Sequence, residues 1–206
     1  MLKLAGELLE GQLADHIADL DAHTRNPFEE IITGQYSNVL VNLDTSVKTL
    51  VADHLYATPY LAARTLTVDR IATEIKVAAA GKSARLGIYR NGTNMYPGAL
   101  VLDCGTIDCG TIDCGATGVK EIVIDQQLSQ GLYWLAVVSD GAPQIEQALV
   151  VSKFMGVIGS NYSSYYVGWD VSQAYGTLPD PFTTGGSLVQ NVTRVPYIVL
   201  RPSSLD

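Results

Sequence analysis

The sequence predicts a mainly β protein, a jelly-roll-like antiparallel β-sandwich preceded by an N-terminal amphipathic helix and arm. Apolar segments follow one another from Leu55 to the C-terminus, and turns rich in Gly, Asn and Pro separate them. Residues 65–79 alternate between apolar and polar side chains, which is typical of a half-buried strand. The 206 residues are 47% hydrophobic and 17% charged, and this composition argues for a folded core and against global disorder.

Residues 1–50 are predicted to form the helix and arm, which would anchor the chain or drive its oligomerisation. Apolar residues recur at helical spacing, and acidic residues occupy the opposite face. Pro27 ends this pattern, because proline cannot continue helical hydrogen bonding. The arm has one candidate strand at residues 37–43. Since an isolated helix of this length is marginal, its apolar stripe is the expected assembly interface. That stripe consists of Leu9, Leu13, Ile17 and Leu20.

Residues 51–206 are predicted to form the β-sandwich. Asn91-Gly92 and Pro97-Gly98 indicate a turn between two of its strands. Tyr133 and Trp134 are neighbours in one strand and point to opposite faces, so we expect Trp134 in the core and Tyr133 nearer an edge or a neighbouring subunit. The predicted strands are residues 55–62, 65–79, 84–89, 99–107, 118–124, 132–138 and 192–200.

An aromatic-rich excursion is predicted at about residues 154–185, where charge nearly vanishes and the chain is expected to leave the sandwich as a long loop. Two interpretations remain open. Exposed rings next to Asn, Ser and Asp could bind glycans, because sugar C–H faces stack on aromatic rings. Alternatively, the rings pack a trimer interface or cover a sheet. The residues concerned are Tyr162, Tyr165, Tyr166, Trp169 and Tyr175.

Several segments together carry a resemblance. Residues 85–89 (RLGIY), 96–103 (YPGALVLD) and 131–136 (GLYWLA) resemble a β-sandwich module common in tail-fibre, head-fibre and related structural proteins of tailed bacteriophages. The upstream residues 56–60 (YATPY) and 69–71 (DRI) fit the same module. The resemblance covers about residues 52–140 and extends to the last strand. It implies a jelly-roll-like domain, a homotrimer, and capsid or tail proteins of the same virion as partners. Within the module, Gly87 and Gly131 suggest a tight turn or a close approach of another segment.

The three cysteines lie in a repeat, residues 103–115, that departs from the module. The repeat reads DCGTIDCGTIDCG, so successive cysteines are five residues apart and would face opposite sides of a strand. This spacing is unlike a tetrahedral metal site. We interpret the repeat as a duplicated strand or hairpin; metal binding across a symmetry axis and intersubunit thiol chemistry are the alternatives. Asp103, Asp108 and Asp113 are expected to be solvated turn residues rather than paired catalytic carboxylates.

No catalytic, metal or cofactor site is predicted, because the sequence has no nucleophile elbow, no His-Glu-x-x-His pattern and no phosphate-binding loop. His16 and His23 are seven residues apart on the expected helix, a spacing too wide for a helical metal pair. The net charge of −8 and the scattered basic residues argue against a role in nucleic-acid binding. The sequence has no long uncharged apolar stretch, so we do not expect it to insert into a membrane. The first residues lack the continuous apolar core of a secretory signal.

The expected function is therefore non-enzymatic. The chain is predicted to be a structural protein of a tailed-phage virion, made in the host cytoplasm. It would serve as a head fibre, a capsid decoration protein or a tail or baseplate fibre component, and it would be trimeric. Host-surface polysaccharide is a further expected partner. The alternative is a free, lectin-like carbohydrate-binding β-sandwich.

Overall fold

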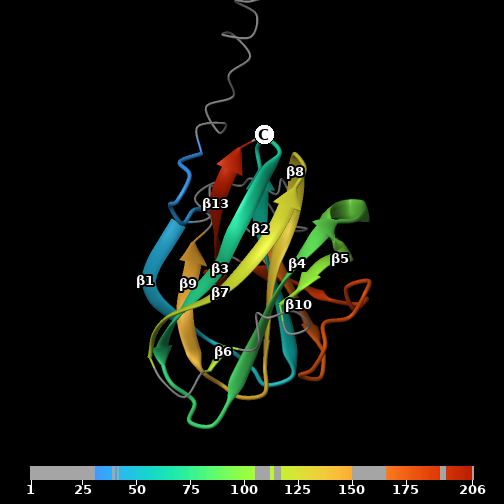
Figure 1. Ribbon diagram of the computed structural model, residues 1–206. Coiled ribbons are helices and arrows are strands. Elements are labelled where there is room, and N and C mark those ends of the chain that lie inside the picture. Colours follow the sequence, from blue (N-terminus) through green and yellow to red (C-terminus); the bar gives the residue numbers. More distant parts are fainter. Residues whose placement is uncertain are drawn as a thin grey trace, which may run out of the picture. The chain divides into compact units, whose positions relative to one another are not determined.

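The computed structural model describes residues 31–38, 40, 42–104, 112–113, 117–149, 166–190 and 194–205. In this part of the chain nearly all regular structure is β, and two antiparallel sheets pack face to face, as predicted (Figure 1). The sheets belong to one compact unit, Ile32–Asp206. The helix predicted in the first residues, with Leu9, Leu13, Ile17 and Leu20, lies outside the described residues.

Sheet A includes the C-terminal strand β13. Its order is β1-β9-β3-β13, with β7 on the other side of β3 and β12 paired to β9. The bounds of its strands are β1 Asn42–Thr49, β3 Leu66–Val77, β7 Gly118–Leu128, β9 Gln144–Leu149, β12 Val195–Pro196 and β13 Val199–Leu205.

Sheet B has the order β11-β10-β2-β8-β4-β5, with the short β6 paired to β4. A 3₁₀ turn, Thr93–Met95, connects β4 to β5 at the predicted Asn-Gly and Pro-Gly positions. The bounds of its strands are β2 His54–Ala62, β4 Ser83–Asn91, β5 Pro97–Asp103, β6 Ile112–Asp113, β8 Gly131–Ser139, β10 Tyr166–Ser172 and β11 Ser187–Gln190.

Eight of these strands have jelly-roll order. In sheet A, β9 lies between β1 and β3, and β7 flanks β3. In sheet B, β8 lies between β2 and β4, and β5 flanks β4. The chain thus passes from sheet to sheet except between β4 and β5, which form a hairpin. This arrangement is the double-sheet jelly roll. The strands β10 to β13 are additions that widen both sheets.

Every strand predicted from residue 55 onward overlaps an observed strand. The overlap is good because, along this part of the chain, apolar segments coincide with the strands and turn residues with the connections between them. The strand predicted at residues 37–43 was wrong in position. The strand there is β1, Asn42–Thr49, and among the described residues before it Ser37 forms an isolated bridge to Leu200. Because β1 pairs with β9, the sandwich includes residues that the prediction placed in the arm before residue 51.

Three observed strands, β9, β10 and β11, were not predicted from the sequence. In β9, the polar residues Glu146 and Gln147 are buried, which conceals the strand pattern. The strands β10 and β11 lie in and just beyond the predicted aromatic excursion, which is therefore not a loop throughout. They pair with each other, and β10 pairs with β2, so this segment extends sheet B.

Buried polar groups hold the two sheets together along one edge. The side-chain amide of Asn38 donates to the carbonyl of Pro59 in β2, at 3.1 Å, and to that of Ile198, at 3.2 Å, just before β13. The Thr58 hydroxyl donates to the Pro196 carbonyl at 2.8 Å. Because Asn38 and Thr58 are buried, these hydrogen bonds satisfy carbonyl groups that would otherwise be costly to bury.

Candidate functional site

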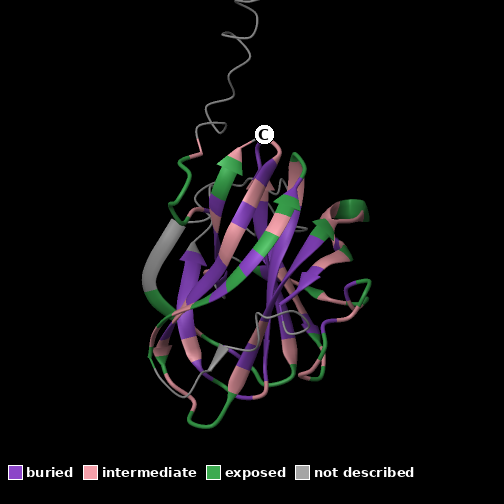
Figure 2. Cartoon of the chain, viewed as in Figure 1, coloured by how far each residue is buried: buried purple, intermediate pink, exposed green. Residues whose placement is uncertain are grey.

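The outer faces of the two sheets differ in what lies on them. Both β2 and β8 of sheet B are buried almost continuously, so both of their faces are covered. In β7 of sheet A, buried and exposed residues alternate instead (Figure 2). A half-buried strand alternates in this way, whereas continuous burial requires a layer on each side. We call the outer face of sheet A the open face.

Residues 173–186, which connect β10 to β11, form the additional layer on sheet B. We call them the cover segment. Phe182 and Leu178 of this segment are 1% and 3% exposed and enter an apolar cluster with side chains from the outer face of sheet B. The Phe182 ring meets the Tyr89 ring edge-on, with 5.1 Å between centroids. The cluster consists of Leu55, Ala57, Tyr89, Trp134, Ala136, Val138, Val171, Leu178 and Phe182.

Hydrogen bonds attach the cover segment to β5 and to the β4–β5 hairpin. The Phe182 amide donates to the Gly98 carbonyl at 2.9 Å, and the Tyr89 hydroxyl donates to the Pro179 carbonyl at 2.9 Å. The Leu178 amide donates to Asp103 Oδ2 at 2.8 Å. Burial is the largest cause of the raised pKa of Tyr89, and this keeps the hydroxyl a donor.

The prediction for Asp103, in the cysteine repeat, was wrong. It was expected to be a solvated turn residue, but it is the last residue of β5 and is 4% exposed. Its carboxylate accepts from the Leu178 amide and pairs with Arg85 at 3.4 Å, which supplies the countercharge that a buried carboxylate needs. Cys104 is also buried. The short strand β6 places Ile112 and Asp113 beside β4, while Cys109 and Cys114 lie outside the described residues.

The close approach expected at Gly87 is explained by the cover segment. A β-carbon at Gly87 would lie 2.2 Å from Leu178 Cδ1 and 2.8 Å from the Leu102 carbonyl oxygen. Gly131 has a φ of +155°, which suits the turn before β8. Trp134 is buried, as predicted. Tyr133 was expected near an edge, but it is 2% exposed, because the inner face of β8 meets the other sheet.

The predicted aromatic residues are only partly described. Trp169, in β10, donates its indole N–H to the Met95 carbonyl at 2.8 Å, and its ring lies 4.6 Å from the Tyr96 ring. Trp169 and Tyr175 both pack against the apolar cluster, and Tyr166 is half-buried in β10. These contacts favour the interpretation in which the rings cover a sheet. Tyr162 and Tyr165 lie outside the described residues.

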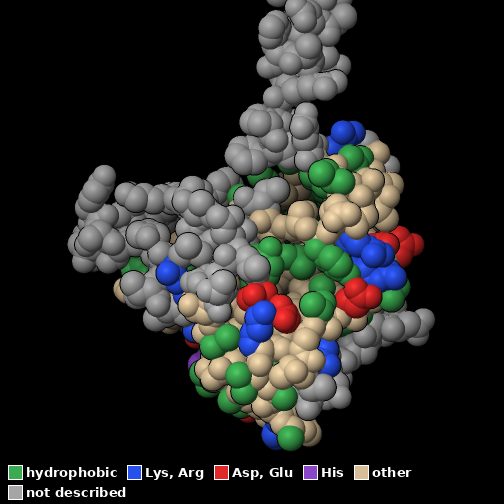
Figure 3. All heavy atoms as spheres, turned by 90° about the vertical axis from the view of Figure 1, so that its left-hand side faces the viewer, with side chains coloured by type: hydrophobic (Ala, Val, Ile, Leu, Met, Phe, Trp, Pro, Cys, Tyr) green, Lys and Arg blue, Asp and Glu red, His purple; other side chains and the backbone are tan. Residues whose placement is uncertain are grey.

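The open face is built from three rows of side chains across β7, β3 and β13. Directly opposite residues in antiparallel strands point to the same face. One row contains Val123, Arg70 and Arg201, and the next contains Glu121, Ala72 and Val199. Val119 and Glu74 form the third row. In Figure 3, hydrophobic side chains on this side of the molecule lie between two groups of acidic and basic side chains.

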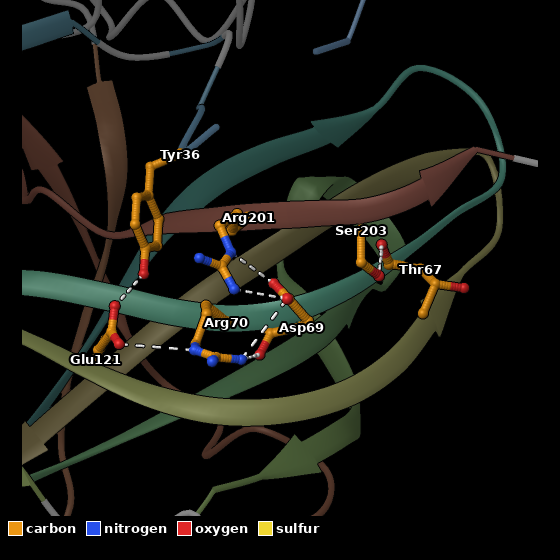
Figure 4. Close-up of polar contacts among 7 residues, drawn as sticks. All are labelled: Tyr36, Thr67, Asp69, Arg70, Glu121, Arg201 and Ser203. Atoms are coloured by element: carbon orange, nitrogen blue, oxygen red, sulfur yellow. Dashed lines mark hydrogen bonds and ion pairs between the residues drawn. The ribbon is translucent and has the colours of Figure 1, made fainter. Parts of the chain in front are cut away.

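The first charged group is an ion-pair network centred on Asp69 (Figure 4). Arg201 binds Asp69 with two hydrogen bonds, of 2.8 and 2.7 Å. Arg70 lies 3.6 Å from both Asp69 and Glu121, and Glu121 also accepts a hydrogen bond from the Tyr36 hydroxyl. The hydrogen bond from Arg201 lowers the pKa of Asp69, whereas burial and the bond to Glu121 raise the pKa of Tyr36 to about 12.

The second charged group lies across a hollow from the first. Lys76 pairs with Glu74 at 2.8 Å and with Glu146 at 3.2 Å, and the hydrogen bonds to these carboxylates raise the pKa of Lys76. The hollow has a volume of about 160 Å³. Its lining is mainly apolar and consists of Tyr36, Ala72, Thr73, Glu74, Val119, Glu146, Tyr197 and Val199.

The ion pairs of the open face join three cationic side chains to four carboxylates. Among the described residues, no three His, Cys, Asp or Glu side chains gather in a way that could hold a metal ion. In the same part of the chain, no helix is long and apolar enough to cross a membrane.

No family model matches the chain, and no curated protein matches it.

Proposed function

We propose that this chain is a non-enzymatic structural protein of a tailed-phage virion, serving as a head fibre, a capsid decoration protein or a tail or baseplate fibre component. In the proposal the sandwich projects from the particle, and the chain is a homotrimer. The N-terminal stripe containing Leu13 and Ile17 binds capsid or tail proteins, or helps the copies to associate. In this proposal the chain is therefore located in the virion.

One observation carries the proposal. Three of the segments that resemble the phage module, residues 85–89, 96–103 and 131–136, lie in the neighbouring strands β4, β5 and β8 of sheet B, while residues 56–60 lie in β2 of the same sheet and residues 69–71 in β3 of sheet A. Tyr89 faces Trp134 between β4 and β8, and Ile88 faces Leu102 between β4 and β5. Segments separated in sequence thus make up a single structural unit. A shared module would place its segments together in this way, and the proposal rests on that placement.

Contact with host-surface glycans is the second part of the proposal. It rests on Tyr166 and Tyr175, which are half-buried in or next to β10, and on the predicted residues Tyr162 and Tyr165. Trp169 is left out, since its ring contacts Tyr96 and its indole N–H is bound to the Met95 carbonyl. Tyr175 is kept because, although it also packs against the apolar cluster, part of its surface is exposed. A glycan array with the wild type and with Tyr175→Ala tests this part. We expect binding that weakens in the variant; an array without any binding would leave only the structural role.

The virion role is tested on purified particles whose genome encodes the chain. We expect the chain to be present in them, and labelled antibody in electron micrographs should mark one location on the particle. The double variant Leu13→Asp, Ile17→Asp should be excluded from particles, whereas Glu10→Gln, on the predicted polar face, should be incorporated normally. Particles that lack the wild-type chain would refute the proposal and favour the free carbohydrate-binding module.

A further inference from the structure

We propose that Asn91 is a modification site, whose side-chain amide is lost through attack by the Gly92 nitrogen when the tip of the β4–β5 hairpin opens. The tip consists of residues 91–96, from the end of β4 to the residue before β5. Asn91-Gly92 is the one Asn-Gly pair in the 206 residues. The inference goes beyond the proposed function, because it assigns a chemical reaction to this hairpin and holds whether or not the chain belongs to a virion.

An Asn-Gly pair loses its side-chain amide without an enzyme. The backbone nitrogen of the glycine attacks the side-chain carbonyl carbon of the asparagine, and glycine permits this approach because it has no β-carbon. The attacking nitrogen loses its proton to a solvent base, the amide nitrogen takes up a proton from solvent, and ammonia leaves as a five-membered succinimide closes. Water then opens the succinimide to aspartate or isoaspartate. The reaction therefore needs a free Gly92 nitrogen and a free Asn91 side chain.

In the folded chain both reacting groups are held by hydrogen bonds. The Gly92 amide donates to the Tyr96 carbonyl at 2.8 Å. The side-chain carbonyl of Asn91 accepts from the indole N–H of Trp134 at 2.9 Å, and its amide group donates to the Gly92 carbonyl at 3.1 Å. Asn91 is also the last residue of β4, and it lies opposite Pro97 of β5. The attack thus requires that the tip first open.

The tip has a strained backbone, so its closed form depends on contacts from other segments. Asn94 and Met95 are adjacent non-glycine residues with φ of +54° and +56°, in the left-handed region that side chains disfavour. From β10, the indole N–H of Trp169 donates to the Met95 carbonyl at 2.8 Å. This bond holds the strained conformation in place, and its loss favours opening.

Tyr96 connects the tip to the cover segment. Its hydroxyl donates to the Thr183 carbonyl and accepts from the Gly186 amide at 2.9 Å. Its ring lies 4.6 Å from the Trp169 ring and 5.6 Å from the Phe182 ring, between centroids. Since the Tyr96 carbonyl is also the acceptor for the Gly92 amide, release of the cover segment frees the nitrogen that attacks Asn91.

The modified chain would not close the tip again in the same form. An aspartate at position 91 would still accept from the Trp134 indole, but a carboxylate oxygen would face the Gly92 carbonyl, to which the amide now donates. An isoaspartate would add a methylene to the backbone and disturb the pairing of β4 with β5. One opening event can therefore leave a permanent change in the hairpin.

The test is peptide mapping by mass spectrometry of the full-length chain during incubation in mildly alkaline buffer. We expect Asn91 to be modified at least about tenfold more slowly in the native chain than in guanidinium, because opening of the tip limits the rate. Tyr96→Phe should raise the native rate about fivefold, since one hydrogen bond contributes a factor of that order. Tyr36→Phe is the matched control, because it removes a hydroxyl that binds Glu121 beside sheet A and should leave the rate unchanged.

Circular dichroism checks that the variants remain folded. If Tyr96→Phe unfolds, Trp169→Phe replaces it, because this variant loses the indole N–H that binds the Met95 carbonyl. Equal rates in the native and the unfolded chain would overturn the inference. So would a native rate that Tyr96→Phe leaves unchanged, or one that Tyr36→Phe raises to the same extent. An Asn91 that stays intact even in guanidinium would also overturn it, and none of these outcomes bears on the virion role.

Discussion

The outer faces of sheets A and B differ in exposure. The outer face of sheet B is covered by another segment of the chain, whereas that of sheet A is exposed among the described residues. On sheet B, the cover segment packs Leu178 and Phe182 over Trp134 and its neighbours, so both faces of β8 are buried. On sheet A, the described residues leave Val119 and Val123 of β7 exposed. The difference lies in what the chain does after β10: it folds back over sheet B and not over sheet A.

Burial on one face or two changes what a sequence pattern means. The segment GLYWLAVV of β8 is an unbroken apolar run, as expected when both faces of a strand are covered. The segment VKEIVIDQ of β7 alternates, with Ile122 and Ile124 buried and Val123 exposed between them. An unbroken run in a sandwich is therefore a signal for a third layer. An apolar residue in the polar register of an alternating strand is a signal for a contact surface.

The largest predicted effect is the loss of stability when a buried side chain on the outer face of sheet B is removed, compared with removal of an exposed side chain on sheet A. Phe182→Ala should lower the free energy of unfolding by about 3–5 kcal/mol, because it removes a buried ring from the cluster on sheet B. Val123→Ala should change it by less than about 0.5 kcal/mol, because that side chain is mostly in solvent. Urea unfolding at several protein concentrations, extrapolated to low concentration, measures both values. Equal effects would contradict the distinction between the two faces.

The next effect concerns how the cover segment is attached. Asp103→Ala should lower the free energy of unfolding by about 3 kcal/mol, since it leaves Arg85 without its countercharge and the Leu178 amide without an acceptor. Limited proteolysis should then cleave faster within residues 173–186. Adding Arg85→Met should restore part of the stability, because the unpaired charge is removed while the Leu178 amide remains unsatisfied. A double variant no more stable than Asp103→Ala would argue against the ion pair.

The smallest effect is a pH dependence of the open face. The pKa of Asp69 is lowered in the folded protein, mainly by the hydrogen bond from Arg201. A lowered carboxyl pKa stabilises the fold above the unfolded pKa of about 3.9, and this stabilisation is lost as the pH falls through the folded pKa. Because the pair is partly exposed, we expect less than about 1 kcal/mol.

Acid titration of stability in the wild type and in Asp69→Asn measures this contribution. The difference between the two proteins should be present at neutral pH and disappear below the folded pKa of Asp69. A difference that persists in strong acid would mean that the substitution acts through packing rather than through the charge of the carboxylate.

The sequence was sufficient for local features that depend on neighbours along the chain. Turn residues at Asn91-Gly92 and Pro97-Gly98 coincide with the end of β4 and the start of β5. The apolar run around Trp134 correctly predicted a core residue. The strands of the jelly roll could be located because alternation and turn chemistry act over a few residues. The tyrosine next to Trp134 could not be placed, since the burial of Tyr133 depends on the opposite sheet.

The candidate site depended on contacts between distant segments. Asp69 and Arg201 are 132 residues apart in sequence and meet because β13 pairs with β3. No local pattern indicates this pairing. The same holds for Asp103, which seemed a turn residue of a repeat until the cover segment brought the Leu178 amide to it.

By itself, then, the sequence determined the class of the fold and the extent of most strands. Short-range periodicity and turn preferences are sufficient for these. Only the tertiary structure decided which sheet is covered, which acidic residues are buried and which valines remain exposed. Those outcomes follow from strand pairing and from the path of residues 173–186, which place side chains together across more than a hundred residues of chain.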